Sequence, residues 1–108
     1  MTRVLLITNE VIGRRMAGPG VRAWEIARAL AAWDGGRAFE VTLAVPPHVS
    51  RATLAAELPF PARLLTPDAA GLRQAAGAAD VVFTQGFVLL VYPWLADASP
   101  VLALDIYD

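Results

Sequence analysis

The chain has 108 residues, of which 56% are hydrophobic, and a formal net charge of −1 at pH 7. This length and apolar content suit one domain with a hydrophobic core and exclude a disordered chain. All nine basic residues are arginine and they are balanced by acidic residues, so no nucleic-acid partner is expected. Without cysteine, the chain has neither disulfides nor thiolate metal sites.

The amino-terminal apolar run Val4–Thr8 predicts the first strand of a sheet. It is too short for a signal sequence or for a membrane span, which needs about 20 residues. A second apolar stretch, Val81–Leu95, is interrupted by Gln85, Gly86 and Pro93 and also falls short of that length. We therefore expect a cytoplasmic protein without a transmembrane segment.

Apolar, strand-like runs alternate with segments of helical spacing along the chain. The expected strands are Val4–Thr8, Glu40–Val45, Ala62–Leu65, Val81–Thr84 and Val101–Leu104. Successive residues in these runs are apolar, as in parallel strands that are covered by helices on both faces. The alternation predicts one α/β domain over residues 1–108, with a doubly wound, Rossmann-like parallel sheet of about five strands in a three-layer α/β/α arrangement.

The first helix is predicted over Val21–Trp33, with Pro19 at an early helical position. Its apolar residues share one face, which should pack on the sheet; they are Val21, Trp24, Ala27, Leu30 and Ala31. Another face carries charged residues at a spacing that allows weak pairing, namely Arg22, Glu25 and Arg28. The helix should end at Asp34-Gly35-Gly36.

Further helices are predicted over Ser50–Glu57, over Pro67–Ala76, and over Phe87–Ala96 with a bend or end near Pro93. The segment Phe87–Leu95 is apolar nearly all round, which predicts burial in the core. The alternative is an apolar wall for a lipid-linked ligand, or a surface that leans on a membrane. The lack of basic neighbours weakens the membrane hypothesis.

The residues between the first strand and the first helix, Asn9–Gly20, combine glycines with two arginines. Backbone N–H groups at the start of a helix and nearby positive charge can converge on an anion. The candidate residues for binding a diphosphate or an acceptor are Arg14, Arg15, Gly18 and Gly20. The alternative is that the glycines only permit a tight turn and that the arginines are solvated.

The segment Gly18–Ala23 also fits the dinucleotide fingerprint G-x-G-x-x-G/A. Its context differs from that of a dinucleotide site, because about ten residues separate Thr8 from Gly18. In addition, the second strand ends in Val45-Pro46-Pro47, without the acidic residue that would hold a ribose. A nicotinamide or flavin cofactor is therefore not expected.

Several segments, taken in order, resemble the opening of the group 1 (family 4) glycosyltransferases of the GT-B fold. Val4–Glu10, Ala17–Leu30 and Phe39–Pro46 are similar to the first strand, the GGxG-like loop with its helix, and the second strand of that family. Ala79–Gly86 resembles the family's "aDvvh.h" strand, and Pro100–Asp108 resembles its "pvv.t.HD" strand end. The resemblance runs the length of the chain.

The resemblance implies the acceptor-side, amino-terminal domain of a two-domain enzyme. Such an enzyme transfers a sugar from a nucleotide-sugar, its co-substrate, to an acceptor that can be lipid-linked, with no cofactor and no metal expected. Gly18 and Gly20 match the glycine loop that approaches the donor diphosphate, although Ala17 stands where the family often has its first glycine. Tyr107 replaces the histidine that many members carry before the aspartate matching Asp108.

The end of the last predicted strand carries the weak catalytic candidates Asp105, Tyr107 and Asp108. Active-site groups of open α/β sheets collect at the carboxyl ends of strands, but these residues are equally compatible with a polar loop. The single histidine, His48, has no partner in sequence and is assigned to the surface or to loop packing. No histidine or carboxylate cluster has metal-ligand spacing.

A doubly wound sheet normally continues with a helix after a buried strand, whereas this sequence stops four residues after Leu104. We therefore expect the front part of a longer transferase, inactive alone and cytoplasmic or peripheral at the membrane when complete. The alternative is a free-standing module that binds a nucleotide or a flavin. A receiver domain is disfavoured because the chain has no lysine. A homo-oligomer formed through exposed apolar surface is also expected.

Overall fold

The computed structural model describes residues 1–9, 12, 18–45, 58–98 and 101–105. Five strands form one sheet in the order β3-β2-β1-β4-β5, and every neighbouring pair is parallel. The strands are β1 (Thr2–Ile7), β2 (Phe39–Ala44), β3 (Ala62–Leu65), β4 (Val81–Gln85) and β5 (Val101–Asp105). All five predicted strands are confirmed, with shifts of at most two residues at their ends.

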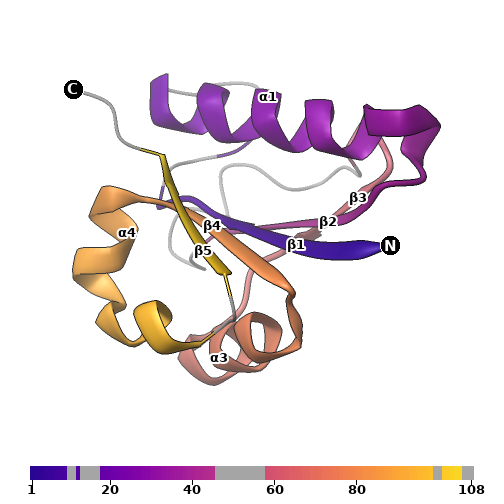
Figure 1. Cartoon of the computed structure of the whole chain (residues 1–108). Coiled ribbons are helices and arrows are strands. Elements are labelled where there is room, and N and C mark those ends of the chain that lie inside the picture. The colour runs from indigo at the N-terminus through magenta and orange to yellow at the C-terminus, as the bar shows by residue number, and fades with distance from the viewer. Residues whose placement is uncertain (10–11, 13–17, 46–57, 99–100, 106–108) are drawn as a thin grey trace.

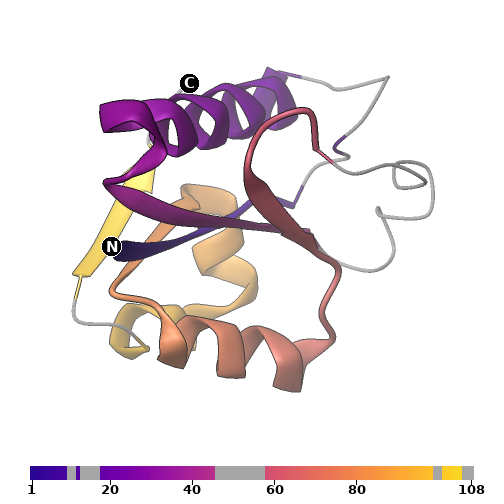
Figure 2. The ribbon, with the colours of Figure 1, turned by 90° about the vertical axis from the view of Figure 1, so that its right-hand side faces the viewer.

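Helices cover both faces of this sheet. Helix α1 (Gly18–Ala32) lies over one face, and helices α3 (Ala69–Ala78) and α4 (Gly86–Val91) lie on the other (Figure 1). Seen from the side, the sheet runs between an upper layer formed by α1 and a lower layer formed by α3 and α4 (Figure 2). The doubly wound, three-layer fold predicted from the sequence is confirmed.

The central strand β1 supplies side chains to both halves of the core. Val4 and Leu6 join the cluster beneath α1, whereas Leu5 and Ile7 join the cluster on the side of α3 and α4. Each of these four side chains is at most 5% exposed. Successive side chains of a strand point to opposite faces, so an unbroken apolar run is what a strand covered on both faces requires.

Helix α1 packs on the sheet through small residues. Its buried positions include Ala23, Ala27 and Ala31, which recur every four residues along one stripe. Trp24 lies beside this stripe and meets Phe60 edge-to-face, with 5.2 Å between ring centroids. The assignment of Val21 to the buried face was wrong, because its side chain is 41% exposed. The buried stripe is rotated toward the alanines, which let the helix approach the strands closely.

The helical segment that begins with α1 ends at Asp34-Gly35-Gly36, as predicted. A short 3-10 helix, η1 (Trp33–Gly36), continues from α1. Asp34, Gly35 and Gly36 all have positive φ, at 51°, 64° and 84°. Residues in this left-handed region cannot continue a right-handed helix, so the chain turns here toward β2.

Helix α3 begins two residues later than the predicted Pro67. The Asp68 side chain accepts a hydrogen bond from the Gly71 backbone N–H at 2.7 Å and so caps the helix from outside. The predicted break at Pro93 is confirmed, because α4 ends at Val91 and a 3-10 helix, η2 (Pro93–Asp97), follows. The predicted helix Ser50–Glu57 lies outside the described residues.

The prediction that Phe87–Leu95 is wholly buried was wrong. Val88 and Leu95 are buried against the core, but Phe87, Leu90 and Val91 are exposed, Leu90 by 80%. Helix α4 packs with only one face against the core cluster on the α3 and α4 side of the sheet. Its other face therefore presents apolar side chains to solvent.

Two glycine substitutions should change stability in opposite directions. Gly36→Ala should lower the free energy of unfolding by about 1–2 kcal/mol, because an L-residue is strained at its φ of 84°. Gly77→Ala, in α3, places a Cβ with no neighbour within 4 Å and should raise stability by up to about 1 kcal/mol. Urea unfolding measures both values. A stabilising Gly36→Ala would contradict the backbone conformation of this turn.

Candidate functional site

The sheet order places a switch point between β1 and β4. From β1 the chain moves outward through β2 to β3 on one side, and from β4 it moves outward to β5 on the other side. In open α/β sheets, ligands bind in the crevice outside the carboxyl ends of the strands at this point. Thr8 follows β1 there and Gln85 is the last residue of β4.

Buried polar side chains gather at this edge. Among the described residues, those that are polar and buried are Thr8, Thr84, Gln85 and Asp105. All of them lie at the carboxyl ends of β1, β4 and β5, and none lies elsewhere in the described core. Burying a polar group is costly unless it is hydrogen-bonded, so this concentration marks a built polar site.

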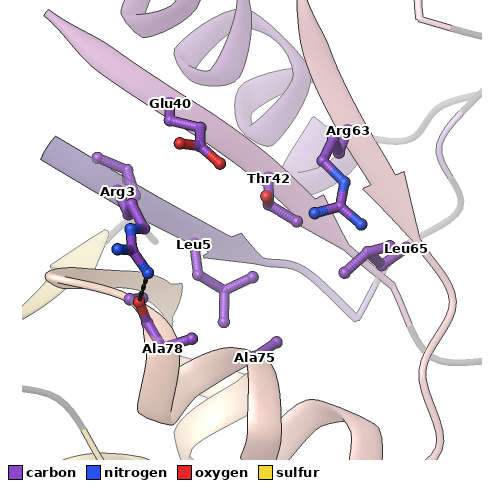
Figure 3. A pocket seen from close by; sticks show the side chains of 10 residues that line it. Arg3, Leu5, Glu40, Thr42, Arg63, Leu65, Ala75 and Ala78 are labelled. Carbon is purple, nitrogen blue, oxygen red and sulfur yellow. Dashed lines mark hydrogen bonds between the residues drawn. The ribbon is translucent and has the colours of Figure 1, made fainter. Parts of the chain in front are cut away.

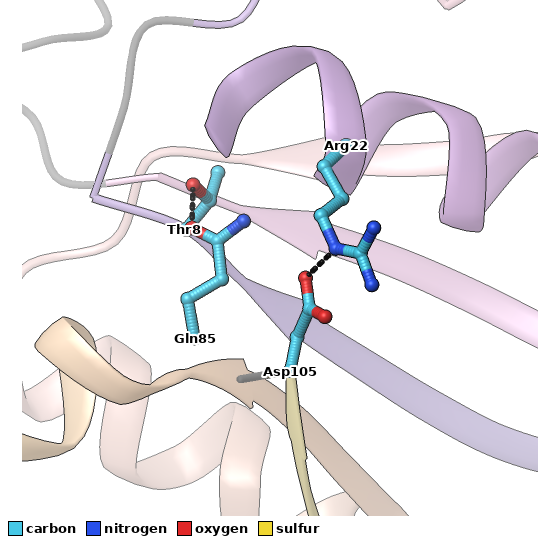
Figure 4. A network of polar contacts seen from close by, with 4 residues as sticks. All are labelled: Thr8, Arg22, Gln85 and Asp105. Atoms are coloured by element: carbon cyan, nitrogen blue, oxygen red, sulfur yellow. Dashed lines mark hydrogen bonds and ion pairs between the residues drawn. The ribbon is translucent and has the colours of Figure 1, made fainter. Parts of the chain in front are cut away.

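A side-chain hydrogen bond crosses the switch point. The Thr8 hydroxyl Oγ1 donates to Gln85 Oε1 at 2.7 Å, and so joins the ends of β1 and β4 (Figure 4). Thr84 Oγ1 lies 3.3 Å from the backbone oxygen of Gln85 and 3.5 Å from that of Ile7. The Thr8 contact holds the Gln85 side chain between neighbouring strands, and the Thr84 hydroxyl is satisfied by backbone oxygens of the same two strands.

An ion pair connects the same edge to α1. Arg22 Nε donates to Asp105 Oδ2 at 2.5 Å, across 83 positions of sequence (Figure 4). The Arg22 side chain is 52% exposed and the Asp105 side chain only 4%. Asp105, predicted as a weak catalytic candidate, therefore acts in this structure as a buried acceptor that orients Arg22. The guanidinium is held at the surface of the site, near the start of α1.

The predicted glycines lie in the first turn of α1, one exposed and one buried. Gly18 is exposed, and a Cβ built on it would meet nothing within 4 Å. Gly20 is buried. No described part of the protein therefore requires glycine at position 18. A ligand that approached the backbone closely at this position would require it. The other predicted site residues, Arg14, Arg15, Tyr107 and Asp108, lie outside the described residues, as does His48.

Sequence reasoning missed Thr8, Thr84, Gln85 and Arg22, and Thr84 was treated only as the end of a strand. Thr8 was assigned to the first strand, Gln85 was treated as an interruption of an apolar run, and Arg22 was expected to pair along its own helix. In the structure Glu25 pairs with Arg28 as predicted, whereas Arg22 reaches β5 instead. The position of these residues in the sequence could have identified the cluster, because polar residues at the ends of buried strands meet at one edge of a parallel sheet.

One hollow lies on the α3 face of the sheet, away from this edge. Its volume is about 160 Å³, and Arg3, Glu40 and Arg63 surround an apolar floor that includes Leu5 (Figure 3). Arg3 is committed to the end of α3, since its Nη1 donates to the Ala78 backbone oxygen at 3.3 Å. Small-molecule sites usually enclose roughly 300–1,000 Å³, so this hollow is small for such a ligand.

Comparisons with protein-family models, with curated proteins and with solved structures find no match for this chain. Within the described part of the chain, no group of three metal-ligating side chains comes together. No described helix combines the length and apolarity needed to cross a membrane. The fold and the polar cluster are therefore the structural features that bear on function.

A double-mutant cycle should detect the ion pair between α1 and β5. Because Asp105 is buried, Arg22→Gln should leave an unpaired carboxylate, and the cycle of Arg22→Gln with Asp105→Asn should give a coupling of about 1–2 kcal/mol. The matched control is Glu25→Gln with Arg28→Gln, whose partners are both more than half exposed, and it should couple by less than about 0.5 kcal/mol. Urea unfolding supplies the values. Equal coupling energies in the two cycles would contradict the prediction that the partly buried pair stabilises the protein more than the exposed pair.

Proposed function

We propose that this chain is the acceptor- and diphosphate-side domain of a group 1 nucleotide-sugar glycosyltransferase of the GT-B type. The doubly wound sheet fits the first of two Rossmann-like domains. The order of motifs along the sequence, from the glycine-bearing segment to the last strand end, supports the same family. The transferred group is a sugar, and the leaving group is a nucleoside diphosphate.

The observation that carries the proposal is Arg22 held by buried Asp105 beside the switch point. A guanidinium matches the geometry of phosphate oxygens better than an ammonium group does. Sugar transfer leaves negative charge on the departing diphosphate, and fixed positive groups stabilise that charge in the transition state. Gly18 and Gly20 at the start of α1, with Arg14 and Arg15 before it, complete the proposed diphosphate side.

We assign the acceptor side to the carboxyl end of β5 and to α4. Tyr107 and Asp108 follow within three residues of Asp105 in sequence and are proposed to contact the acceptor. The exposed apolar face of α4, formed by Phe87, Leu90 and Val91, starts two residues after Gln85. A lipid-linked acceptor would place its polar head at the cluster and its apolar chain along this face. Such an acceptor would bring the full enzyme to the cytoplasmic side of a membrane.

A free-standing nucleotide- or flavin-binding module is the second candidate. The observation in its favour is the G-x-G-x-x-A pattern of Gly18–Ala23, which falls in the first two turns of α1. Against it, β2 ends in Ala44 and is followed by Val45, so no acidic side chain stands where a dinucleotide ribose would be held.

Pyrophosphate should raise the melting temperature of the 108-residue chain, because a ligand bound only to the folded state stabilises it. At about 100 times Kd the gain is about 2.7 kcal/mol, or several degrees by differential scanning fluorimetry. Arg22→Gln should abolish the shift, whereas Arg28→Gln, on the same helix but paired with Glu25, should keep it. Equal melting-temperature shifts in both variants would show that Arg22 does not contribute to pyrophosphate binding.

The two candidate functions separate with other ligands. The transferase proposal expects no shift with FMN or NAD and no sugar transfer by the chain alone in a coupled assay with a nucleotide-sugar such as UDP-glucose. The second domain that would hold the nucleotide is not among the elements described here. Sugar transfer above background would contradict the proposal that catalysis requires the second domain. A shift with FMN or NAD, without one for pyrophosphate, would favour the free-standing module.

A further inference from the structure

Charged side chains surround the hollow of about 160 Å³ on the α3 face of the sheet. Glu40 is the second residue of β2 and Arg63 is the second residue of β3, and both side chains turn toward the space over Leu5 (Figure 3). The two residues are diagonal neighbours, because Arg63 is in register with Thr42, two residues after Glu40. The spacing of parallel strands puts their Cα atoms roughly 8 Å apart.

These two opposite charges are not paired with each other. The ion pairs within the described part of the chain do not include Glu40 or Arg63, and neither side chain hydrogen-bonds to a described residue. The carboxylate therefore keeps its acceptors and the guanidinium keeps its donors for another molecule. A ligand that carries both an ammonium and a carboxylate group would satisfy the two side chains at once.

The floor of the hollow is apolar and its volume limits the size of a ligand. Leu5, which is 2% exposed, and Leu65 lie on the sheet side, and Ala75 lies on the side of α3. Because α3 presents small side chains here, space remains between the helix and the strands. A volume of about 160 Å³ corresponds to roughly five water molecules at about 30 Å³ each. A small amino acid fits this space, and a nucleotide does not.

We propose that this hollow binds a small apolar α-amino acid as its zwitterion. Arg63 donates to the carboxylate of the ligand, and Glu40 accepts from its ammonium group. Thr42, which lies beside Arg63 in the sheet, offers a hydroxyl, and the side chain of the ligand rests on Leu5. Hydrogen bonds between charged partners are the stronger ones, so the two charged contacts supply most of the affinity.

The mixed charge of the hollow selects this class of ligand. A simple carboxylate would be repelled by Glu40, and a simple amine would be repelled by Arg63 and Arg3. A peptide terminus carries only one of the two charges, so a free amino acid matches better. A neighbouring hollow of about 390 Å³ shares Glu40 and Arg63, but Thr42 and Leu5 do not line it.

The site is separate from the polar cluster at the other end of the sheet. Arg3, Glu40 and Arg63 each occupy the second position of a strand, whereas the cluster lies at the carboxyl ends of β1, β4 and β5. The inference therefore stands or fails independently of the proposed function.

Titration of the nitrogen-15-labelled 108-residue chain with L-valine, followed by NMR, tests the proposal. A ligand this small should bind with a Kd of about 1 mM, and the amide signals of Leu5, Thr42 and Ala75 should shift and saturate. Two analogues each lack one charge: 3-methylbutanoate has no ammonium group and 2-methylpropylamine has no carboxylate. Each should bind about tenfold more weakly than L-valine. Absence of saturable shifts with L-valine, or equal binding of either analogue, would overturn the proposal.

Substitutions around the hollow locate the binding site. Glu40→Gln and Arg63→Gln should each weaken L-valine binding by about tenfold, and Ala75→Leu should abolish binding because it fills the hollow without changing the charge. The matched controls are Arg28→Gln on α1 and Ala70→Leu at an exposed position of α3, and both should leave the Kd unchanged. Circular dichroism checks that every variant is folded. Unchanged binding in the three hollow variants, or an equal loss in the controls, would overturn the proposal.

Discussion

The fold depends on β1 being buried on both faces. Val4, Leu5, Leu6 and Ile7 occupy the centre of the sheet, and their alternation obliges helices to pack on each side. Once both faces are covered, polar side chains can reach the interior only where the strands stop. The buried polar residues Thr8, Thr84, Gln85 and Asp105 accordingly lie at strand ends. The position of the candidate site is thus a consequence of how the core is built.

The Arg22–Asp105 pair then converts this edge into an organised site. It connects α1 with β5 through two residues that lie 83 positions apart in sequence. Thr8 and Gln85 add a side-chain link between β1 and β4, at the end of the backbone ladder that already pairs these two strands. Together these side chains hold the ends of three strands and the start of a helix in one arrangement. A ligand that entered here would meet groups whose positions are already fixed, which is the condition for selective binding at low entropic cost.

The sequence predicted elements well and contacts poorly, for identifiable reasons. Strands and the end of α1 were predicted because apolar runs and the Asp34-Gly35-Gly36 turn act locally. The burial of Val21 and of Phe87–Leu95 was predicted wrongly because local pattern shows that a face is apolar, but not whether another element covers it. Arg22 illustrates the same limit at the site, since Glu25 is its neighbour in sequence whereas Asp105 becomes its neighbour only after the sheet forms. Asp105 was placed correctly at a strand end, because that position follows from the order of the elements.

Charge balance at the edge determines what the site can bind. Within the Arg22–Asp105 pair one positive charge is cancelled by one negative charge, and the whole chain carries a formal net charge of −1. Attraction of an anion therefore cannot arise from a general field and must come from oriented donors at short range. A guanidinium held by one carboxylate keeps a defined plane, and the partial positive charge at the start of α1 adds to it. Arg14 and Arg15 precede that helix in sequence and are the proposed source of the positive charge that the pair lacks. Recognition of a diphosphate by this edge would accordingly need both the fixed arginine and the arginine-bearing segment.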